Sequence, residues 1–251
     1  MVRFRKQALF LGLFLSLLMQ GCGMREDGLA PVEESTWRGT NPSVTSHVVT
    51  RGETLYAIAF RYEQDYHRLA VLNGLKSSYA LRVGQVIKLK SSSSVENFAE
   101  SVAKALPKLP KLPLISDHSS WHWPTHGRIM ATFSPSKGRK GINIAGKKGS
   151  NIRSSAAGVV AYAGDGLPGY GHLIILKHDS EYLTAYGNNQ KNLVHSGQHV
   201  KQGQVIAEMG VVNRRFWGVH FEMRRRGEPV NPLDYLKKKL DNAPVFIATM
   251  G

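Results

Sequence analysis

The segment Trp217–Arg224 reads Trp-Gly-Val-His-Phe-Glu-Met-Arg. Successive side chains of a β-strand point to opposite faces of its sheet, so alternate residues of this segment share a face. One face carries the apolar residues Val219, Phe221 and Met223. The other face carries Gly218, His220 and Glu222. The alternation predicts a strand with one buried apolar face and with a histidine and a carboxylate on the opposite face.

Further short β-type segments, broken by glycine, extend from about residue 121 to residue 240. The candidate strands are residues 128–133, 158–163, 172–178, 182–186, 205–209 and 217–224. This spacing predicts a mainly antiparallel β-domain. A short helix is expected from Pro232 to Leu240 at its end, and residues 241–251 are left as a C-terminal tail.

Several motifs in the same stretch resemble the LytM, or lysostaphin-type, zinc endopeptidase domain. They are Trp123-Pro124, Lys140–Ala145, Ala157–Val160, Gly169–Gly171, the glycine-spaced segment Val200–Gly210, and His220-Phe221-Glu222-x-Arg224. The resemblance covers almost all of residues 121–240. It implies a groove in which active members of the family hold a zinc ion.

The resemblance also implies that this groove has lost its metal. A catalytic zinc ion needs three protein ligands and one open position. Arg139 and Asn143 stand where active members carry the first two ligands, a His and an Asp, and His220 stands at the third. Asn188 and Gly218 replace two further catalytic histidines. Because an arginine stays protonated and does not ligate, we expect no metal, no cofactor and no enzymatic activity.

A smaller domain is predicted at residues 47–90. Residues 47–50 and 84–89 read as strands, and residues 55–62 and 66–72 read as helices with Glu53 or Thr54 as the first cap. This strand-helix-helix-strand order and three separated motifs resemble the LysM domain. The resemblance implies binding of glycan chains that contain N-acetylglucosamine. The implied glycan contacts are Gly52, Glu53, Thr54, Leu55, Asn73, Gly74 and Leu75. An alternative is that Gly52 and Asn73-Gly74 only supply turns.

The first 21 residues predict a signal peptide. Basic residues precede an apolar run from Ala8 to Met19, which is shorter than the roughly 20 residues that span a bilayer. Cys22 is the only cysteine of the chain, so it has no internal disulfide partner. Its position resembles a bacterial lipoprotein signal, which implies lipidation at Cys22. The alternative is a plain signal peptide with an incidental cysteine. Gly23 after the cysteine implies anchoring on the periplasmic side of the outer membrane.

The chain is strongly basic, with 33 Lys and Arg residues against 18 Asp and Glu residues and a net charge of +15. Such a balance suits either nucleic acid or anionic envelope polymers. The expected export excludes nucleic acid as a partner. Residues 22–46 are polar and predict a flexible tether, and residues 91–120 predict a Ser- and Pro-rich linker between the two domains.

The order of lipoprotein signal, LysM domain and LytM domain resembles the NlpD-type murein hydrolase activators. It implies a protein that binds peptidoglycan and activates an N-acetylmuramoyl-L-alanine amidase during cell division. The candidate partner groove consists of Arg139, Asn143, Asn188, Arg214, Arg215, Trp217, Gly218 and His220. Two alternatives remain open: an active zinc murein endopeptidase with altered ligands, and a passive tether between the outer membrane and the wall.

Overall fold

The computed structural model describes residues 44–76, 78–89 and 121–236. The predicted signal peptide, tether, linker and C-terminal tail therefore lie outside the described residues, except for a few at their edges. No helix among the described residues is long and apolar enough to cross a membrane.

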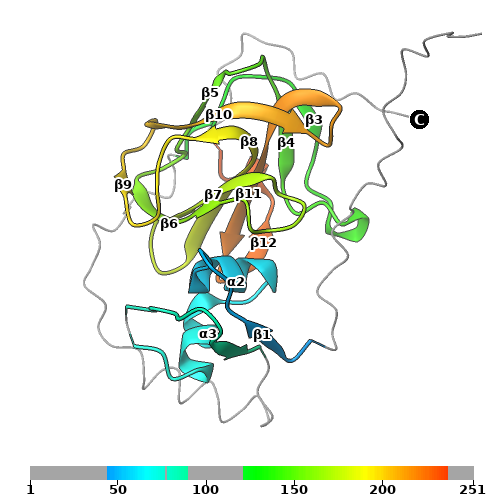
Figure 1. The fold of residues 1–251 in the computed structure, drawn as a ribbon. Helices are drawn as coiled ribbons and strands as arrows, with labels where there is room; N and C mark the ends of the chain where they lie inside the picture. The colour runs from blue at the N-terminus through cyan, green and yellow to red at the C-terminus, as the bar shows by residue number, and fades with distance from the viewer. Residues whose placement is uncertain (1–43, 77, 90–120, 237–251) are drawn as a thin grey trace, which may run out of the picture. The chain divides into compact units, whose positions relative to one another are not determined.

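The first domain has the predicted strand-helix-helix-strand order (Figure 1). Its elements are β1 (Ser46–Val48), α2 (Leu55–Arg61), α3 (Tyr66–Leu72) and β2 (Val86–Lys88), and β1 pairs with β2 in antiparallel fashion. Thr54 caps α2 by accepting a hydrogen bond from the Ala57 amide, and Asp65 caps α3 in the same way. Such side-chain acceptors satisfy amides that a helix start leaves unpaired.

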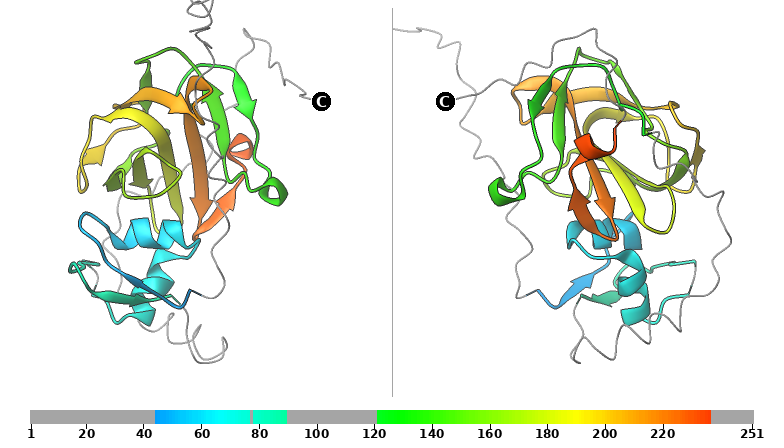
Figure 2. Two further views of the ribbon diagram at one scale, coloured as in Figure 1. Left: turned by 45° about the vertical axis from the view of Figure 1, so that its right-hand side comes forward. Right: turned by 180° about the vertical axis from the view of Figure 1, so that it is seen from behind.

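The second domain is built on ten antiparallel strands (Figures 1 and 2). They are β3 (Ile129–Ala131), β4 (Ile142–Ala145), β5 (Asn151–Arg153), β6 (Gly158–Gly164), β7 (His172–Lys177), β8 (Tyr182–Asn192), β9 (His199–Val200), β10 (Val205–Val212), β11 (Phe216–Arg225) and β12 (Glu228–Val230). The order in the sheet is β3-β4-β11-β10-β8-β7-β6-β9, with β12 beside β11 and β5 beside β10. The predicted mainly antiparallel β-domain is confirmed.

The structure differs from the sequence-based expectation in element length. β4, β5, β9 and β12 were not expected, since two to four residues are too few to show a period of two. The predicted helix from Pro232 to Leu240 is wrong over its described part, which forms only a 3-10 turn, Pro232–Asp234. Before it, η1 (Pro135–Lys137) forms another such turn.

The predicted apolar face of the Trp217–Arg224 segment is confirmed. Val219, Phe221 and Met223 are each 0% exposed and pack in the main core of the second domain with residues from β4, β8 and β10. β11 lies between β4 and β10 in the sheet, and it also pairs with β8. β11 therefore lies in the middle of the sheet, with its apolar face in the core and its polar face on the opposite side of the sheet.

His178 is a buried histidine whose ionisation opposes folding. Nδ1 lies 2.7 Å from the Ala157 carbonyl oxygen and Nε2 lies 2.7 Å from the Thr184 hydroxyl. Burial lowers the pKa of His178 from 6.5 to about 4. Between these two values the unfolded chain binds a proton that the folded chain does not. The stabilisation is therefore complete above pH 6.5 and is lost as the pH falls toward 4, by at most about 1.4 kcal/mol per pH unit.

We expect His178→Gln to flatten this dependence. Urea denaturation between pH 4 and pH 7 should show a smaller fall in the free energy of unfolding for the variant than for the parent protein. The matched control is His199→Gln, since His199 is exposed. Equal pH dependence of the parent and His178→Gln proteins would contradict the assignment.

Candidate functional site

The polar face of β11 lies at the centre of the candidate site. The register pairs His220 with Asn143 on β4 and with Gly187 on β8. Residues directly opposite each other in an antiparallel pair point to the same face. Asn143, His220 and Gly187 therefore form a row across three strands, which the sequence motif alone did not reveal.

Both ring nitrogens of His220 are engaged. Nδ1 lies 2.7 Å from Oδ1 of Asn143, and Nε2 lies 2.9 Å from Oε1 of Glu222. The carboxylate accepts the Nε2–H, so a neutral ring then needs a donor at Nδ1. The Asn143 carboxamide supplies it when its NH₂ group is turned toward the ring, and oxygen and nitrogen of such a group are assigned from hydrogen bonding alone. Neither nitrogen is left with a free lone pair.

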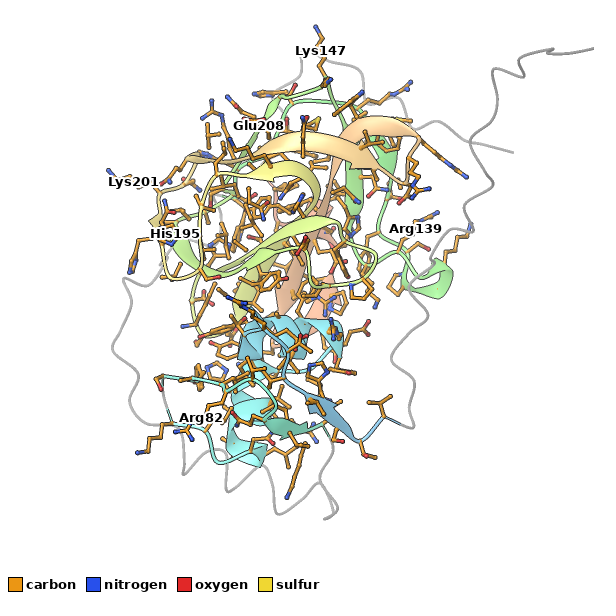
Figure 3. All side chains as sticks on the ribbon, in the orientation of Figure 1. Arg82, Arg139, Lys147, His195, Lys201 and Glu208 are labelled. Carbon is orange, nitrogen blue, oxygen red and sulfur yellow. The ribbon has the colours of Figure 1, made fainter. Side chains whose placement is uncertain are left out.

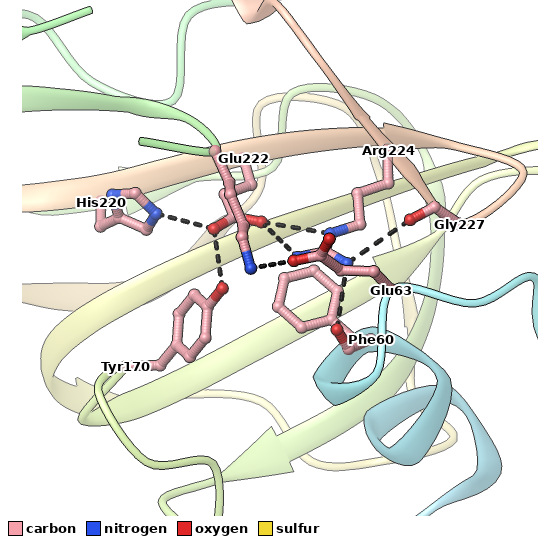
Figure 4. Close-up of polar contacts among 8 residues, drawn as sticks. Phe60, Glu63, Tyr170, His220, Glu222, Arg224 and Gly227 are labelled. Atoms are coloured by element: carbon pink, nitrogen blue, oxygen red, sulfur yellow. Dashed lines mark hydrogen bonds and ion pairs between the residues drawn. The ribbon is translucent and has the colours of Figure 1, made fainter. Parts of the chain in front are cut away.

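Glu222 joins His220 to a buried arginine (Figure 4). Its Oε2 accepts hydrogen bonds from Nη2 of Arg224 at 2.9 Å and from Nε at 3.2 Å, and its Oε1 accepts one from the Tyr170 hydroxyl at 2.8 Å. Burial raises the pKa of Glu222, but the Arg224 charge and the hydrogen bonds from His220 and Tyr170 outweigh burial and lower the pKa to about 2. Glu222 is thus a fixed carboxylate that orients His220.

The residues around His220 do not fit a zinc ion. Asn143 offers a carboxamide that is already bonded to the ring, and the Glu222 carboxylate is held by Arg224 and Tyr170. Within the described ranges, no group of three or more His, Cys, Asp or Glu side chains is placed to hold a metal ion. A zinc site needs three available ligands and an open position.

The structure brings only some of the other predicted groove residues to this row. Gly218 lies on β11 beside Ala145 of β4. Asn188 follows Gly187 with a φ of 60°, a left-handed conformation that asparagine tolerates. Arg139 is exposed (Figure 3). Its Nε donates to the Thr132 carbonyl oxygen rather than to Asn143 or His220. The exposed Arg214 and Arg215 lie in the turn between β10 and β11.

Trp217 is a predicted groove residue that the structure places on the other face of the sheet. Because side chains alternate along β11, Trp217 points to the face opposite His220, where Lys148 Nζ lies 5.5 Å from its ring centroid. Phe216 takes its place on the site face. A Cβ built on Gly218 would lie 2.7 Å from Cε2 of Phe216, so this ring covers the glycine. The alternation that defines the His220 face also predicts Phe216 on it.

The predicted glycan contacts of the first domain divide into internal and surface residues. Leu55 is 0% exposed, and the Glu53 carboxylate is bonded to His47, to the Thr50 amide and to Arg61. The Asn73 side chain joins α3 to β2 through Leu69 and Lys88. These side chains hold the domain together.

The remaining predicted contacts differ in their surroundings. Gly52 is exposed, and the Thr54 hydroxyl donates to the Ala161 carbonyl oxygen of the second domain at 3.0 Å. Gly74 and Leu75 line a hollow of about 630 Å³. Its other lining residues include Leu81, Arg82, Val83 and Gln85. Arg82, one of these lining residues, projects into solvent at this edge of the domain (Figure 3).

Two family models match the chain. The LysM domain model matches residues 47–90, and the model of peptidase family M23 matches residues 137–232. The first domain is hereafter the LysM domain and the second the M23 domain.

Relatives match over most of the chain. It is 35% identical to a lipoprotein NlpD/LppB homolog of Pseudomonas aeruginosa over 92% of both chains. It is 36% identical to the lipoprotein YgeR of Escherichia coli, with 93% of this chain and 95% of the relative covered. It is 33% identical to the murein hydrolase activator NlpD of Escherichia coli, with 78% and 69% covered. Its two domains, in this order, and its likeness along almost its whole length show that the chain belongs to the NlpD/LppB family of lipoproteins.

Proposed function

We propose that this protein is a cell-envelope lipoprotein that binds peptidoglycan through its LysM domain and activates an N-acetylmuramoyl-L-alanine amidase through a catalytically inactive M23 domain. Lipidated Cys22 would hold it on the periplasmic side of the outer membrane. The relatives that are named lipoproteins and murein hydrolase activators support this proposal. The hollow beside Gly74 and Leu75 is the proposed glycan site.

One observation supports the proposed loss of catalysis. His220 stands where the resemblance places a zinc ligand, and Asn143 and Glu222 hold both of its ring nitrogens. A neutral imidazole held in this way uses its Nε2–H and its Nδ1 lone pair in these two hydrogen bonds. Asn143 bonds to His220 through one carboxamide atom and presents the other beside the nearby Phe216 ring, a polar group next to an apolar one of the kind that anchors a protein segment.

The experiment is a reconstitution. The full chain, purified in detergent, is treated with EDTA, freed of the chelator, and added to labelled peptidoglycan alone and together with a wall amidase. We expect no release of label by the chain alone, and more release by the mixture than by the amidase alone. Release by the untreated chain alone that EDTA abolishes would show an enzyme and overturn the proposal. Binding to peptidoglycan without any effect on the amidase would leave a passive tether.

The partner surface is tested by two neighbouring aromatic residues. We expect Phe216→Ala to raise the protein concentration for half-maximal amidase activation about tenfold, because truncation of an anchor at a protein interface commonly costs more than 1 kcal/mol. Trp217→Ala is the matched control, since both side chains are partly exposed but Trp217 lies on the opposite face. If only Trp217→Ala raised the concentration for half-maximal activation, the partner site would lie on the face of Trp217 instead.

A further inference from the structure

Helix α2 of the LysM domain packs on the M23 sheet face that carries His220. The register pairs Glu222 with Ala185 and Arg224 with Leu183, so these β8 residues share the face of His220. Ala185 is in turn opposite Ile175 on β7. This face is therefore partly apolar, and it is continuous with the candidate partner site.

Two residues of α2 complete an apolar cluster on this face. Ala57 and Phe60 are 1% and 2% exposed and pack with buried residues of the M23 domain rather than in the LysM core. The M23 members of the cluster are Ala161, Tyr162, Leu167, Tyr170, Leu173, Ile175, Leu183 and Ala185. The Phe60 ring meets Tyr170 edge-on, at 5.4 Å between ring centroids. Separation of the two domains would expose this cluster to water, which is unfavourable for so many apolar side chains.

Polar contacts fix the position of α2 on the face. Nη1 of Arg224 donates to the Phe60 carbonyl oxygen at 3.0 Å, and the guanidinium lies 3.7 Å from the Phe60 ring centroid (Figure 4). Glu63 forms an ion pair with Lys140. Nη2 of Arg61 donates to the Gly166 carbonyl oxygen at 2.7 Å. These polar contacts between the two domains hold α2 in one position beside the apolar cluster.

The backbones of the two domains also meet closely. Gly227, between β11 and β12, has a φ of +88°, and a Cβ built on it would lie 2.4 Å from the Gln64 carbonyl carbon. Only a residue without a side chain permits this approach. The fit between the domains thus extends from side chains to main chain.

The Phe60–Arg224 contact reaches the candidate partner site through a continuous set of hydrogen bonds. Arg224 holds Glu222, Glu222 holds His220, and His220 holds Asn143. The docked helix does not cover this end of the face, because the His220 side chain remains 20% exposed and Asn143 and Asn188 remain partly exposed. The position of α2 therefore supports the site rather than blocking it.

We propose that the LysM domain is a structural wall of the partner site, and that Phe60 of α2 is a positioning residue that fixes the Arg224–Glu222–His220 chain in its binding geometry. The LysM domain then has a role beyond glycan binding. This inference rests on the proposed activation of an amidase, and it predicts that the M23 domain activates fully only with α2 docked.

The test compares Phe60→Ala with the parent protein, both as full chains in detergent. We expect at least a tenfold higher concentration for half-maximal amidase activation, with peptidoglycan binding unchanged because Phe60 lies outside the LysM core. In histidine-labelled protein, the ring nitrogen signals of His220, assigned with His220→Gln, should shift. Phe60→Leu should restore most of the activation. Val48→Ala, an exposed change in the same domain that lies outside the hollow, is the matched control.

Ala57→Asp provides a second, independent variant, because it places a charge in the apolar cluster without touching Arg224. It should weaken activation as Phe60→Ala does. Parent-like activation and parent-like His220 signals in both variants would contradict the proposal that α2 positions the partner site. Stronger activation in both variants would also contradict it, because it would show that docked α2 blocks the partner site. If the parent protein itself fails to activate the amidase, the proposed function fails, and the His220 signals still report whether α2 positions the site.

Discussion

Replacement of Arg224 by methionine is expected to lower the free energy of unfolding by about 3–5 kcal/mol, because it leaves a buried carboxylate without its counter-charge. The Arg224 and Glu222 side chains are each 1% exposed. The pKa of Glu222, about 2, shows how strongly its surroundings favour the charged form. Guanidinium denaturation at pH 7 measures the loss.

The control is Arg225→Met, one residue further along β11. Its side chain is 51% exposed and pairs with Glu181 at the surface, so little change is expected. The double variant Glu222→Gln, Arg224→Met removes both charges and should recover part of the stability. Equal free energies of unfolding for Arg224→Met and Arg225→Met would contradict this expectation, because they would show that Glu222 stays buried without Arg224 at no cost in stability.

Gly218→His, which restores the histidine that active LytM enzymes carry at this position, is expected to destabilise the protein by about 3 kcal/mol through overpacking and to produce no peptidase. A Cβ at this position would lie 2.6 Å from the Ile144 carbonyl oxygen on the paired strand β4, as well as against the Phe216 ring. A ring can move aside, whereas the strand backbone is held by its ladder. The chain has thus closed the space that a second histidine requires.

Gly218→Ala tests this explanation, since it adds the Cβ without the imidazole. Most of the destabilisation should already appear in the alanine variant, as measured by denaturation beside the parent protein. Adding Phe216→Ala to Gly218→His should recover only the part of the lost stability that comes from the clash with the Phe216 ring. A fully stable Gly218→Ala protein would show that β4 and β11 separate without cost.

The sequence predicted the strand around His220 and the domain type, because both depend on patterns within a few residues. The resemblance placed Asn143 and His220 in one groove, but it did not predict their hydrogen bond, which depends on the register between strands 77 residues apart. The short strands β5 and β9 also escaped prediction, since their pairing rather than their composition defines them.

The contact between the two domains had a signal in the sequence that was not used. Leu55, Ile58, Ala59 and Tyr62 recur at helical spacing in the sequence as one stripe, and all four lie in or against the LysM core. Phe60 and Ala57 lie off this stripe, and a helix that is apolar all round is buried all round. The run Leu173–Leu176 of β7 is likewise apolar on both faces, which indicates a sheet covered on both sides. Neither pattern says which element covers the other.

The fit between Gly227 and the main chain of the LysM domain has a consequence for the segment that joins the two domains. Because contacts among described residues set the position of α2, we expect the length of the joining segment, residues 90–120, to matter little for that position. The entropy of closing such a loop grows slowly with its length, by about 0.6 kcal/mol for each doubling. We therefore expect insertions or deletions between residues 89 and 121 to be tolerated, whereas a Cβ at position 227 would lie 2.4 Å from the Gln64 carbonyl carbon and should not be.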